Sequence, residues 1–188
     1  MKNMSSTHEV EIKFRIADFD TLTASLQSAR FELLTARTHE MNTLYDLPGR
    51  DLRARGALLR LRQYGDKWTL TYKDKAATQG KHKSRPEIET QVENGPAMDQ
   101  ILQALGFQPS FSYEKFRTEW TDQRGHVVLD ETPVGNFGEI EGSPEWIDAI
   151  AARLGISESQ YIKLSYTELF REWKRANGSS AEHMLFAK

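Results

Sequence analysis

Hydrophobic and charged residues alternate strictly along the segment Glu9-Val10-Glu11-Ile12-Lys13-Phe14-Arg15-Ile16. A period of two places the apolar side chains on one face of a strand and the charged ones on the other, so a strand is predicted from about residue 8 to residue 16. Seven more segments have strand character, at about residues 31–45, 57–64, 67–73, 87–93, 110–121, 126–132 and 136–141. The two that flank Gly65-Asp66 form the clearest hairpin.

Between these strands the apolar period lengthens to that of a helix. Predicted helices follow Asp18 or Asp20, run from Gly95-Pro96 to Gly106, run from Ser143 to Gly155, and span residues 158–175. The polar stretch 74–83 is predicted to be a loop. Residues 1–7 are predicted to be a disordered N-terminus, residues 8–175 a single domain, and residues 176–188 a C-terminal tail.

Charged residues recur two positions apart on several of the predicted strands. The pairs are Glu9 and Glu11, Arg60 and Arg62, Glu87 and Glu89, Lys115 and Arg117, and Glu139 and Glu141. So many charged stripes need a common location, and a closed barrel with a charged, hydrated interior provides one. Amphipathic helices would then cover the apolar strand faces outside. The alternative is an ordinary α+β sheet whose charged faces are solvated, as in most open antiparallel sheets.

The composition fits one domain of 188 residues, with 38% hydrophobic residues and a formal net charge of −2. A charge so close to neutral argues against binding to nucleic acid or to an anionic membrane. The chain has no cysteine, which excludes disulfides, thiolate metal sites and thiol nucleophiles. No apolar run approaches the length of a membrane span, so a cytoplasmic protein is expected, and a homodimer is compatible with such a barrel.

The acidic pairs indicate a metal site. Glu9 with Glu11, and Glu139 with Glu141, place two carboxylates on one strand face, where they repel each other unless a cation lies between them. Carboxylate oxygens without His or Cys suit Mg²⁺ or Mn²⁺. A solvated, salt-bridged strand face is the alternative for any one of these pairs.

The basic residues indicate a phosphate site, with surface charge again as the alternative for each pair alone. Rows of cations on neighbouring strands, formed by Arg60, Arg62, Lys73, Lys115 and Arg117, match the line of negative charges in a triphosphate or polyphosphate. No phosphate-binding loop of the Gly-x-x-x-x-Gly-Lys-Ser/Thr type is present, and the five histidines show no metal spacing. A small-molecule triphosphate is therefore the expected partner.

These residues, in this order, resemble the CYTH family, which joins class IV adenylate cyclases with thiamine triphosphatases and inorganic triphosphatases. Glu9-x-Glu11-x-Lys13 is similar to the ExExK signature of that family. Later blocks are similar in the same order, namely Tyr45-Asp46 with Leu52–Arg62, Leu70–Lys73, Arg85–Glu89, Tyr113–Arg117, Val128–Asp130, Phe137–Gly142 and Lys163–Tyr166. The resemblance covers about residues 8–170.

The resemblance implies an α+β triphosphate tunnel fold, in which an eight-stranded antiparallel β-barrel has amphipathic helices packed outside. It implies that the metal, Mg²⁺ or Mn²⁺, is bound by Glu9, Glu11, Glu139 and Glu141. It implies that the triphosphate is bound by Lys13, Arg60, Arg62, Lys73, Lys115, Arg117 and Lys163. Glu89, Lys73 and Asp130 are the implied catalytic residues, with the two acids helping to place the metal or the water.

Two reactions share such a tunnel. A triphosphatase uses water to cleave the terminal phosphoanhydride of inorganic triphosphate, thiamine triphosphate or a nucleoside triphosphate. A class IV adenylate cyclase uses the ribose 3′-oxygen of ATP and makes cyclic AMP and pyrophosphate. One cyclase subgroup has His-Phe six and five residues before the first Glu, where this chain has Asn3 and Met4. This departure argues against a cyclase of that subgroup but does not exclude cyclase activity, so hydrolysis is the expected reaction and cyclisation the alternative. A non-catalytic binder of polyphosphate or nucleotide is the remaining alternative.

Overall fold

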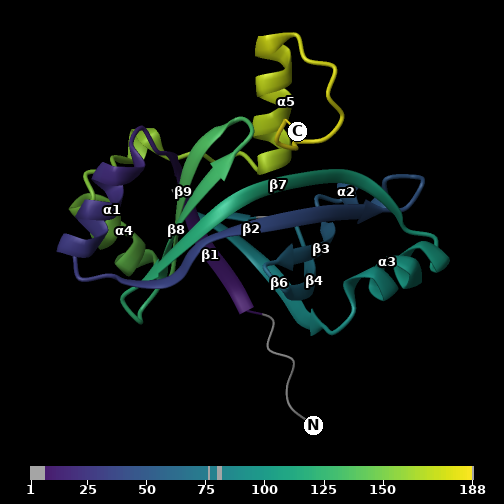
Figure 1. The fold of residues 1–188 in the computed structure, drawn as a ribbon, viewed down its shortest axis with the longest axis horizontal. Helices are drawn as coiled ribbons and strands as arrows, with labels where there is room; N and C mark the ends of the chain where they lie inside the picture. The colour runs from purple at the N-terminus through teal and green to yellow at the C-terminus, as the bar shows by residue number, and fades with distance from the viewer. Residues whose placement is uncertain (1–6, 76, 80–81, 188) are drawn as a thin grey trace.

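Eight antiparallel strands close into a barrel in the computed structural model, which describes residues 7–75, 77–79 and 82–187 (Figure 1). The strands are β1 (Thr7–Arg15), β2 (Glu32–Asp46), β3 (Leu58–Tyr64), β4 (Lys67–Lys73), β6 (His82–Val92), β7 (Gln108–Thr121), β8 (His126–Thr132) and β9 (Gly135–Glu141). They pair in the order β1-β9-β8-β7-β2-β3-β4-β6, and β6 pairs back to β1. The short strand β5 (Ala77–Gln79) pairs with β6. The predicted eight-stranded barrel is confirmed.

Helices pack on the outside of the barrel, as predicted (Figure 1). They are α1 (Phe19–Ser28), α2 (Asp51–Ala54), α3 (Gly95–Ala104), α4 (Pro144–Arg153) and α5 (Tyr166–Asn177), with a 3₁₀ turn, η1, at Glu158–Gln160. The side chains of Asp18, Asn94, Ser143 and Ser165 cap four of them by accepting a backbone N–H. Within the described ranges, no helix has both the length and the apolar character needed to cross a membrane.

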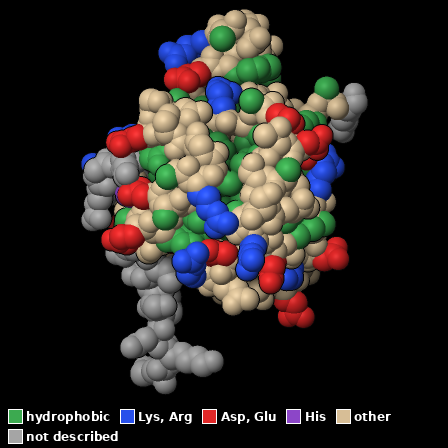
Figure 2. Space-filling model, turned by 90° about the vertical axis from the view of Figure 1, so that its left-hand side faces the viewer, with side chains coloured by type: hydrophobic (Ala, Val, Ile, Leu, Met, Phe, Trp, Pro, Cys, Tyr) green, Lys and Arg blue, Asp and Glu red, His purple; other side chains and the backbone are tan. Residues whose placement is uncertain are grey.

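The outward faces of β1, β8 and β9 form the largest hydrophobic core together with α1 and α4. Ile12 and Phe14 of β1 are buried there, and Leu26, Ile140 and Ile147 are fully buried. Burial of each side chain of this size contributes about 1.5–3 kcal/mol. Figure 2 shows the side of the molecule that carries α1 and α4, where acidic and basic side chains are intermingled at the surface. The apolar strand faces are therefore covered by helices whose outer sides are solvated.

The inward faces of the strands carry the charges, which is the reverse of an open antiparallel sheet. Lys13, Glu40, Lys115, Asp130 and Glu139 are all buried, with at most 5% of each residue exposed. The strand register brings opposite charges together, since Lys13 lies opposite Glu139 and Lys115 lies opposite Glu40. The closed barrel excludes the alternative of solvated charges on an ordinary sheet.

Two predicted element boundaries are wrong. The stretch 74–83 is not a loop throughout, because β5 and the start of β6 form a hairpin there. The predicted helix 158–175 is instead η1, an extended segment and then α5. The break has a physical cause, since the backbone N–H of Ile162 donates to the carbonyl of Lys13 at 2.7 Å and ties this segment to β1. The predicted disordered residues 1–7 lie outside the described part of the chain, apart from Thr7, which begins β1.

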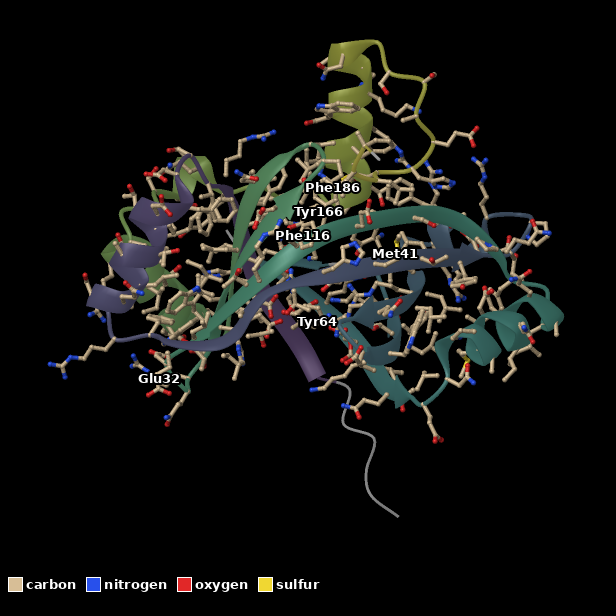
Figure 3. The ribbon with its side chains drawn as sticks, in the orientation of Figure 1. Glu32, Met41, Tyr64, Phe116, Tyr166 and Phe186 are labelled. Carbon is tan, nitrogen blue, oxygen red and sulfur yellow. The ribbon has the colours of Figure 1, made fainter. Side chains whose placement is uncertain are left out.

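The C-terminal tail covers an open edge of β7. Pairing between β7 and β8 begins only at Phe116, so the earlier residues of β7 are not paired with β8 on that side. There the N–H of Met184 donates to the carbonyl of Ser112, and the carbonyl of Met184 accepts from the N–H of Glu114, both at 3.0 Å. Met184 is fully buried against aromatic side chains, and Phe186 packs on Phe116 (Figure 3). The tail therefore completes the barrel wall below α5.

Candidate active site

The barrel encloses a cavity of about 340 Å³, the lumen, whose lining is mostly charged. Seven basic and six acidic side chains line it, namely Lys13, Arg60, Arg62, Lys73, Arg85, Lys115 and Arg117, and Glu9, Glu11, Glu87, Glu89, Glu139 and Glu141. Ser165, Tyr166 and Thr167, at the N-terminus of α5, line it too. The lumen therefore brings together all the sequence-predicted site residues except Asp130 and Lys163.

Three carboxylates of the predicted metal set gather on two neighbouring strands. Glu11 of β1 lies opposite Glu141 of β9, and Glu9 follows two residues away on the same face of β1. One oxygen from each of these three residues, the acidic trio, lies within 4.8 Å of the others. Burial, and then the charge of Glu139, raises the pKa of Glu141 to about 8. A divalent cation would relieve this crowding, and hard oxygen donors of this kind fit Mg²⁺ or Mn²⁺.

Glu139, the fourth predicted metal ligand, is held by cations. Its carboxylate forms buried ion pairs with Lys13 at 3.1 Å and with Arg117 at 2.6 Å. Burial opposes its ionisation, but Lys13, Arg117 and Lys115 keep the pKa of Glu139 well below its ordinary range. Burial likewise opposes the charge on Lys13, yet Glu139 and then Glu11 raise the pKa of that lysine. Glu139 thus lies beside the acidic trio as a fixed counter-charge for two basic residues.

Two rows of cations lie across the barrel from the acidic trio. In the ring of strands, β2 lies opposite β1 and is flanked by β3, which carries Arg60 and Arg62, and by β7, which carries Lys115 and Arg117. Arg60 and Arg62 lie 3.9 and 3.5 Å from Glu89. The Nε atoms of both arginines are buried and have no hydrogen-bond partner among the described residues. Buried donors without partners are suited to an anionic ligand.

Lys73 connects the acidic trio with the arginine row. Its ammonium group donates a hydrogen bond to Glu9 and lies 3.1 Å from Glu87. Burial and Arg60 oppose the charge on Lys73, but Glu9 and Glu87 raise its pKa overall. In turn, Lys73 lowers the pKa of Glu9 despite burial. Lys73 therefore stays protonated in the wall of the lumen, where an ammonium group can contact a phosphate oxygen.

Asp130 and Lys163 do not line the lumen. Asp130 is fully buried in the barrel wall. It accepts two hydrogen bonds from Arg117 at 2.7 Å, one from Lys115 at 2.9 Å and one from Tyr166 at 2.6 Å. Asp130 therefore orients lumen cations from behind. Lys163 is exposed and lines a second groove beside the lumen.

Sequence reasoning missed Glu40 and Tyr166, which complete the wall. Glu40 is fully buried, 3.4 Å from Lys115 and 3.9 Å from Arg62. Burial opposes its ionisation, but Lys115 and further cations hold the pKa of Glu40 at about 2. Extending the period of two along the predicted strand 31–45 could have placed Glu40 on the lumen face. Tyr166, which lies at the start of α5 (Figure 3), gives no such signal, because only the docking of α5 brings its hydroxyl within 2.6 Å of Asp130.

Comparison with known proteins gives matches over nearly the whole chain. The sequence model of the CYTH domain matches residues 7–166. The adenylate cyclase CyaB of Aeromonas hydrophila is 25% identical over 182 residues, covering 88% of this chain and 93% of the relative. A solved structure named "putative adenylate cyclase", from Vibrio parahaemolyticus, has a TM-score of 0.78 at 20% identity and covers 89% of this chain and 99% of its own. "Putative adenylyl cyclase HpAC1" from Hippeastrum, described as having a dominant triphosphatase activity, has a TM-score of 0.65 at 19% identity, with 87% and 95% covered.

Proposed function

Because the chain belongs to the CYTH domain family, we propose that it is a divalent-metal-dependent triphosphate hydrolase. It cleaves the terminal phosphoanhydride of inorganic triphosphate, thiamine triphosphate or a nucleoside triphosphate. The observation that carries this proposal is the division of the lumen, in which two rows of cations face the acidic trio across a closed barrel. The Hippeastrum protein, which has a similar fold, is described as mainly a triphosphatase.

Substrate binding follows from the charge of the lumen. A triphosphate is negative along its whole length, and the arginines of β3 and β7 offer guanidinium groups that bind two oxygens at once. Glu40 and Asp130 hold Lys115 and Arg117 from behind. The cations are therefore fixed before the substrate arrives, and they need little reorganisation as charge moves during the reaction.

Hydrolysis of a phosphoanhydride depends mainly on positioning and on stabilising the charge of the transferred and departing phosphates. Lys73 and Arg60 neutralise that charge from the side of β3 and β4. Glu89, whose side chain is 39% exposed beside Arg60, is the carboxylate available to orient a water molecule. A divalent cation held by the acidic trio would supply Lewis-acid polarisation of phosphate oxygens and of the attacking water.

The second candidate function is that of a class IV adenylate cyclase, which the name of the Aeromonas relative favours. In that reaction the ribose 3′-oxygen of ATP attacks the α-phosphorus and its hydroxyl loses the proton. The bond between the α-phosphorus and the bridging oxygen breaks, so that pyrophosphate departs and cyclic AMP is formed. The same cations and carboxylates would serve, because both reactions break a phosphoanhydride bond and develop charge on phosphate oxygens.

Phosphorus NMR of the purified protein separates these candidates. The protein is incubated with each triphosphate in the presence of Mg²⁺ or Mn²⁺. Release of orthophosphate is the expected result and supports the hydrolase. Release of pyrophosphate with cyclic AMP supports the cyclase instead. Unchanged substrate together with measurable binding identifies a non-catalytic binder and contradicts both enzymatic candidates.

The variant Glu11→Gln tests whether the acidic trio is the metal site. We expect it to abolish metal-dependent turnover, because it removes one of three clustered carboxylates, and to leave the circular dichroism spectrum unchanged. Glu93→Gln, at an exposed position just after β6, is the matched control and should keep wild-type turnover. A Glu11→Gln protein that turns over substrate normally would mean that Glu11 is not a metal ligand acting in catalysis. Loss of folding with no separate catalytic defect would mean that Glu11 is a structural residue.

A further inference from the structure

We propose that a basic groove beside the tunnel binds the part of a linear condensed phosphate that extends beyond the lumen. The basic groove is the surface lined by Arg50, Arg53, Lys75, Lys163, Arg171 and Lys174. The ligands of this protein would then include phosphate chains longer than triphosphate. This inference rests on the proposed function, because the lumen must hold the end of the same chain.

The basic groove is continuous with the lumen. It has a volume of about 960 Å³, compared with about 340 Å³ for the lumen. Five residues line both spaces, namely Leu44, Leu58, Arg85, Ser165 and Thr167. A chain too long for the lumen can therefore leave it past Arg85 and the N-terminus of α5. From there it would lie along the surface between α2 and α5.

The basic groove carries more positive charge than its own carboxylates balance. Its three acidic residues are Asp46, Glu168 and Glu182. Asp46 already accepts three backbone N–H groups, and Glu168 accepts the backbone N–H and the hydroxyl of Ser165. In the part of the chain that the structure describes, none of the six defining cations forms a salt bridge. The groove thus presents cations to a ligand that brings its own negative charge.

Like charges are held together in this groove. Burial, and then Arg53 and Arg50, lowers the pKa of Arg171, and Glu168 offsets only part of that repulsion. The arginines come from the region of α2 and from α5, which are distant in sequence, so it is the packing of α5 that brings them together. An anion bound between them would replace this repulsion with charge-assisted hydrogen bonds.

The lining favours a chain of phosphates over the base of a nucleotide. Its aromatic residues, Tyr45, Phe111 and Phe170, are only 3%, 8% and 4% exposed. Among the described residues of the groove, no ring face is therefore open for a base to stack on. The exposed charged groups of the lining are mostly guanidinium and ammonium groups, which suit repeated phosphates.

The test compares the binding of two probes by calorimetry in metal-free buffer, which prevents turnover. The probes are inorganic triphosphate and a longer linear polyphosphate of defined length. The groove variant is Arg53→Ala combined with Arg171→Ala. The control, Lys67→Ala combined with Arg153→Ala, removes the same charge from exposed positions outside the groove.

Wild-type protein is expected to bind the longer chain more tightly than triphosphate. The groove variant should lose about tenfold in affinity for the longer chain and less than about twofold for triphosphate, while the control matches the wild type. Equal losses for both probes would overturn the inference. So would an unchanged affinity of the groove variant for the longer chain, or equal binding of the two probes by the wild type.

Turnover of inorganic triphosphate with Mg²⁺ or Mn²⁺ separates this inference from the proposed function. Wild-type turnover with unchanged long-chain binding in the groove variant would refute the groove alone. A wild type that turns over none of inorganic triphosphate, thiamine triphosphate and the nucleoside triphosphates would refute the hydrolase, and the binding comparison would still decide the groove. If the alanine variant unfolds at a lower temperature, Arg53→Gln combined with Arg171→Gln takes its place, because glutamine keeps the carbon chain of the side chain as far as Cδ and removes the charge.

Discussion

Glu141 shows how a closed lumen changes a carboxylate. Its pKa of about 8 in the folded protein compares with about 4.3 for a glutamate in an unfolded chain. The folded protein therefore keeps a proton on Glu141 that the unfolded chain releases. The resulting contribution to stability is complete below about pH 4 and is lost as the pH rises toward 8. Repulsion among the clustered carboxylates thus lowers the stability of the folded protein at the higher pH values, where Glu141 is deprotonated and can bind a metal.

This leads to a prediction for the metal-free protein in a buffer that contains a chelator. We expect its unfolding temperature to fall between about pH 5 and pH 8, and the substitution Glu141→Gln to flatten that fall. Added Mn²⁺ should raise the unfolding temperature more at pH 8 than at pH 6, because metal ligation requires the deprotonated carboxylate. Thermal unfolding across this pH range measures both effects. A Glu141→Gln variant with the wild-type slope would assign the titration to another group.

Glu40 has the opposite behaviour. The pKa of Glu40, about 2 in the folded protein, lies below the value in the unfolded chain. The contribution of Glu40 to the stability of the folded protein is therefore present above about pH 4 and is lost as the pH falls toward 2. We expect Glu40→Gln to lower the free energy of unfolding by about 3 kcal/mol at pH 7. It should also tighten triphosphate binding, because Lys115 and Arg62 lose a competing anion.

Urea denaturation and calorimetry measure these two quantities, with Glu93→Gln as an exposed control. Urea is preferred because a guanidinium salt would screen the charges. A Glu40→Gln variant that binds triphosphate more weakly would mean that Glu40 acts on binding mainly by holding Lys115 in position and not as a competing anion.

The site residues that could be predicted from the sequence are mainly those whose position follows from the alternation of residues along a strand. Glu9 and Glu11 follow from alternation in one segment, and family resemblance places Glu141 with them. Alternation could not separate Glu139 from Glu141, because their different roles depend on ion pairs formed with Lys13 and Arg117 across other strands. Roles of that kind depend on cross-strand neighbours, which a single segment does not reveal.

Among the elements, the position of α5 and of the tail that follows it depends most clearly on contacts with distant parts of the chain. Met184 is fully buried, whereas its neighbour Leu185 is 41% exposed. We expect Met184→Ala to lower the free energy of unfolding by about 2–5 kcal/mol, as large-to-small changes in a core do. Leu185→Ala should change it by less than about 0.5 kcal/mol. Chemical denaturation of both variants tests the pair, and equal effects would mean that the tail is not part of the core.

The sequence pattern predicted the strands and helices whose apolar faces repeat locally. It failed at residues 158–175, where a helical pattern is interrupted because Ile162 pairs with β1. It also gave no position for the tail, since the contact of Met184 with Tyr113 depends on an edge of β7 left free by a short β8. Both failures come from contacts between segments that are distant in sequence.

For the whole molecule, closure of the ring is the step that joins distant parts of the chain. β3 and β4 form a local hairpin, whereas β1 pairs with β6 and β9. Long-range pairing requires the closure of long loops, so the contacts of β1 should form late in folding. The closed barrel itself was predictable, because charged faces on five of its strands need a common interior. The register of its strands could not be predicted in the same way, because it depends on all the strand pairings together.

A comparison of two buried residues tests this order. Ile12 of β1 and Leu61 of the hairpin are each 3% exposed. We expect Ile12→Ala mainly to speed unfolding and Leu61→Ala mainly to slow folding, because interactions formed late are absent from the transition state. Stopped-flow measurements across denaturant concentration give both rates. The reverse pattern would show that β1 docks early.

The pairing of β1 also has a consequence during synthesis. β1 leaves the ribosome before both of its partners, because residues 83–87 and 137–141 follow it in the sequence and are made much later. At roughly 5–20 residues per second, the nascent strand waits for several seconds without a neighbour. An unpaired apolar strand is prone to join other chains, and alternating charges oppose this. We expect the glutamates and the lysine of β1, which later line the lumen, also to oppose aggregation of the growing polypeptide.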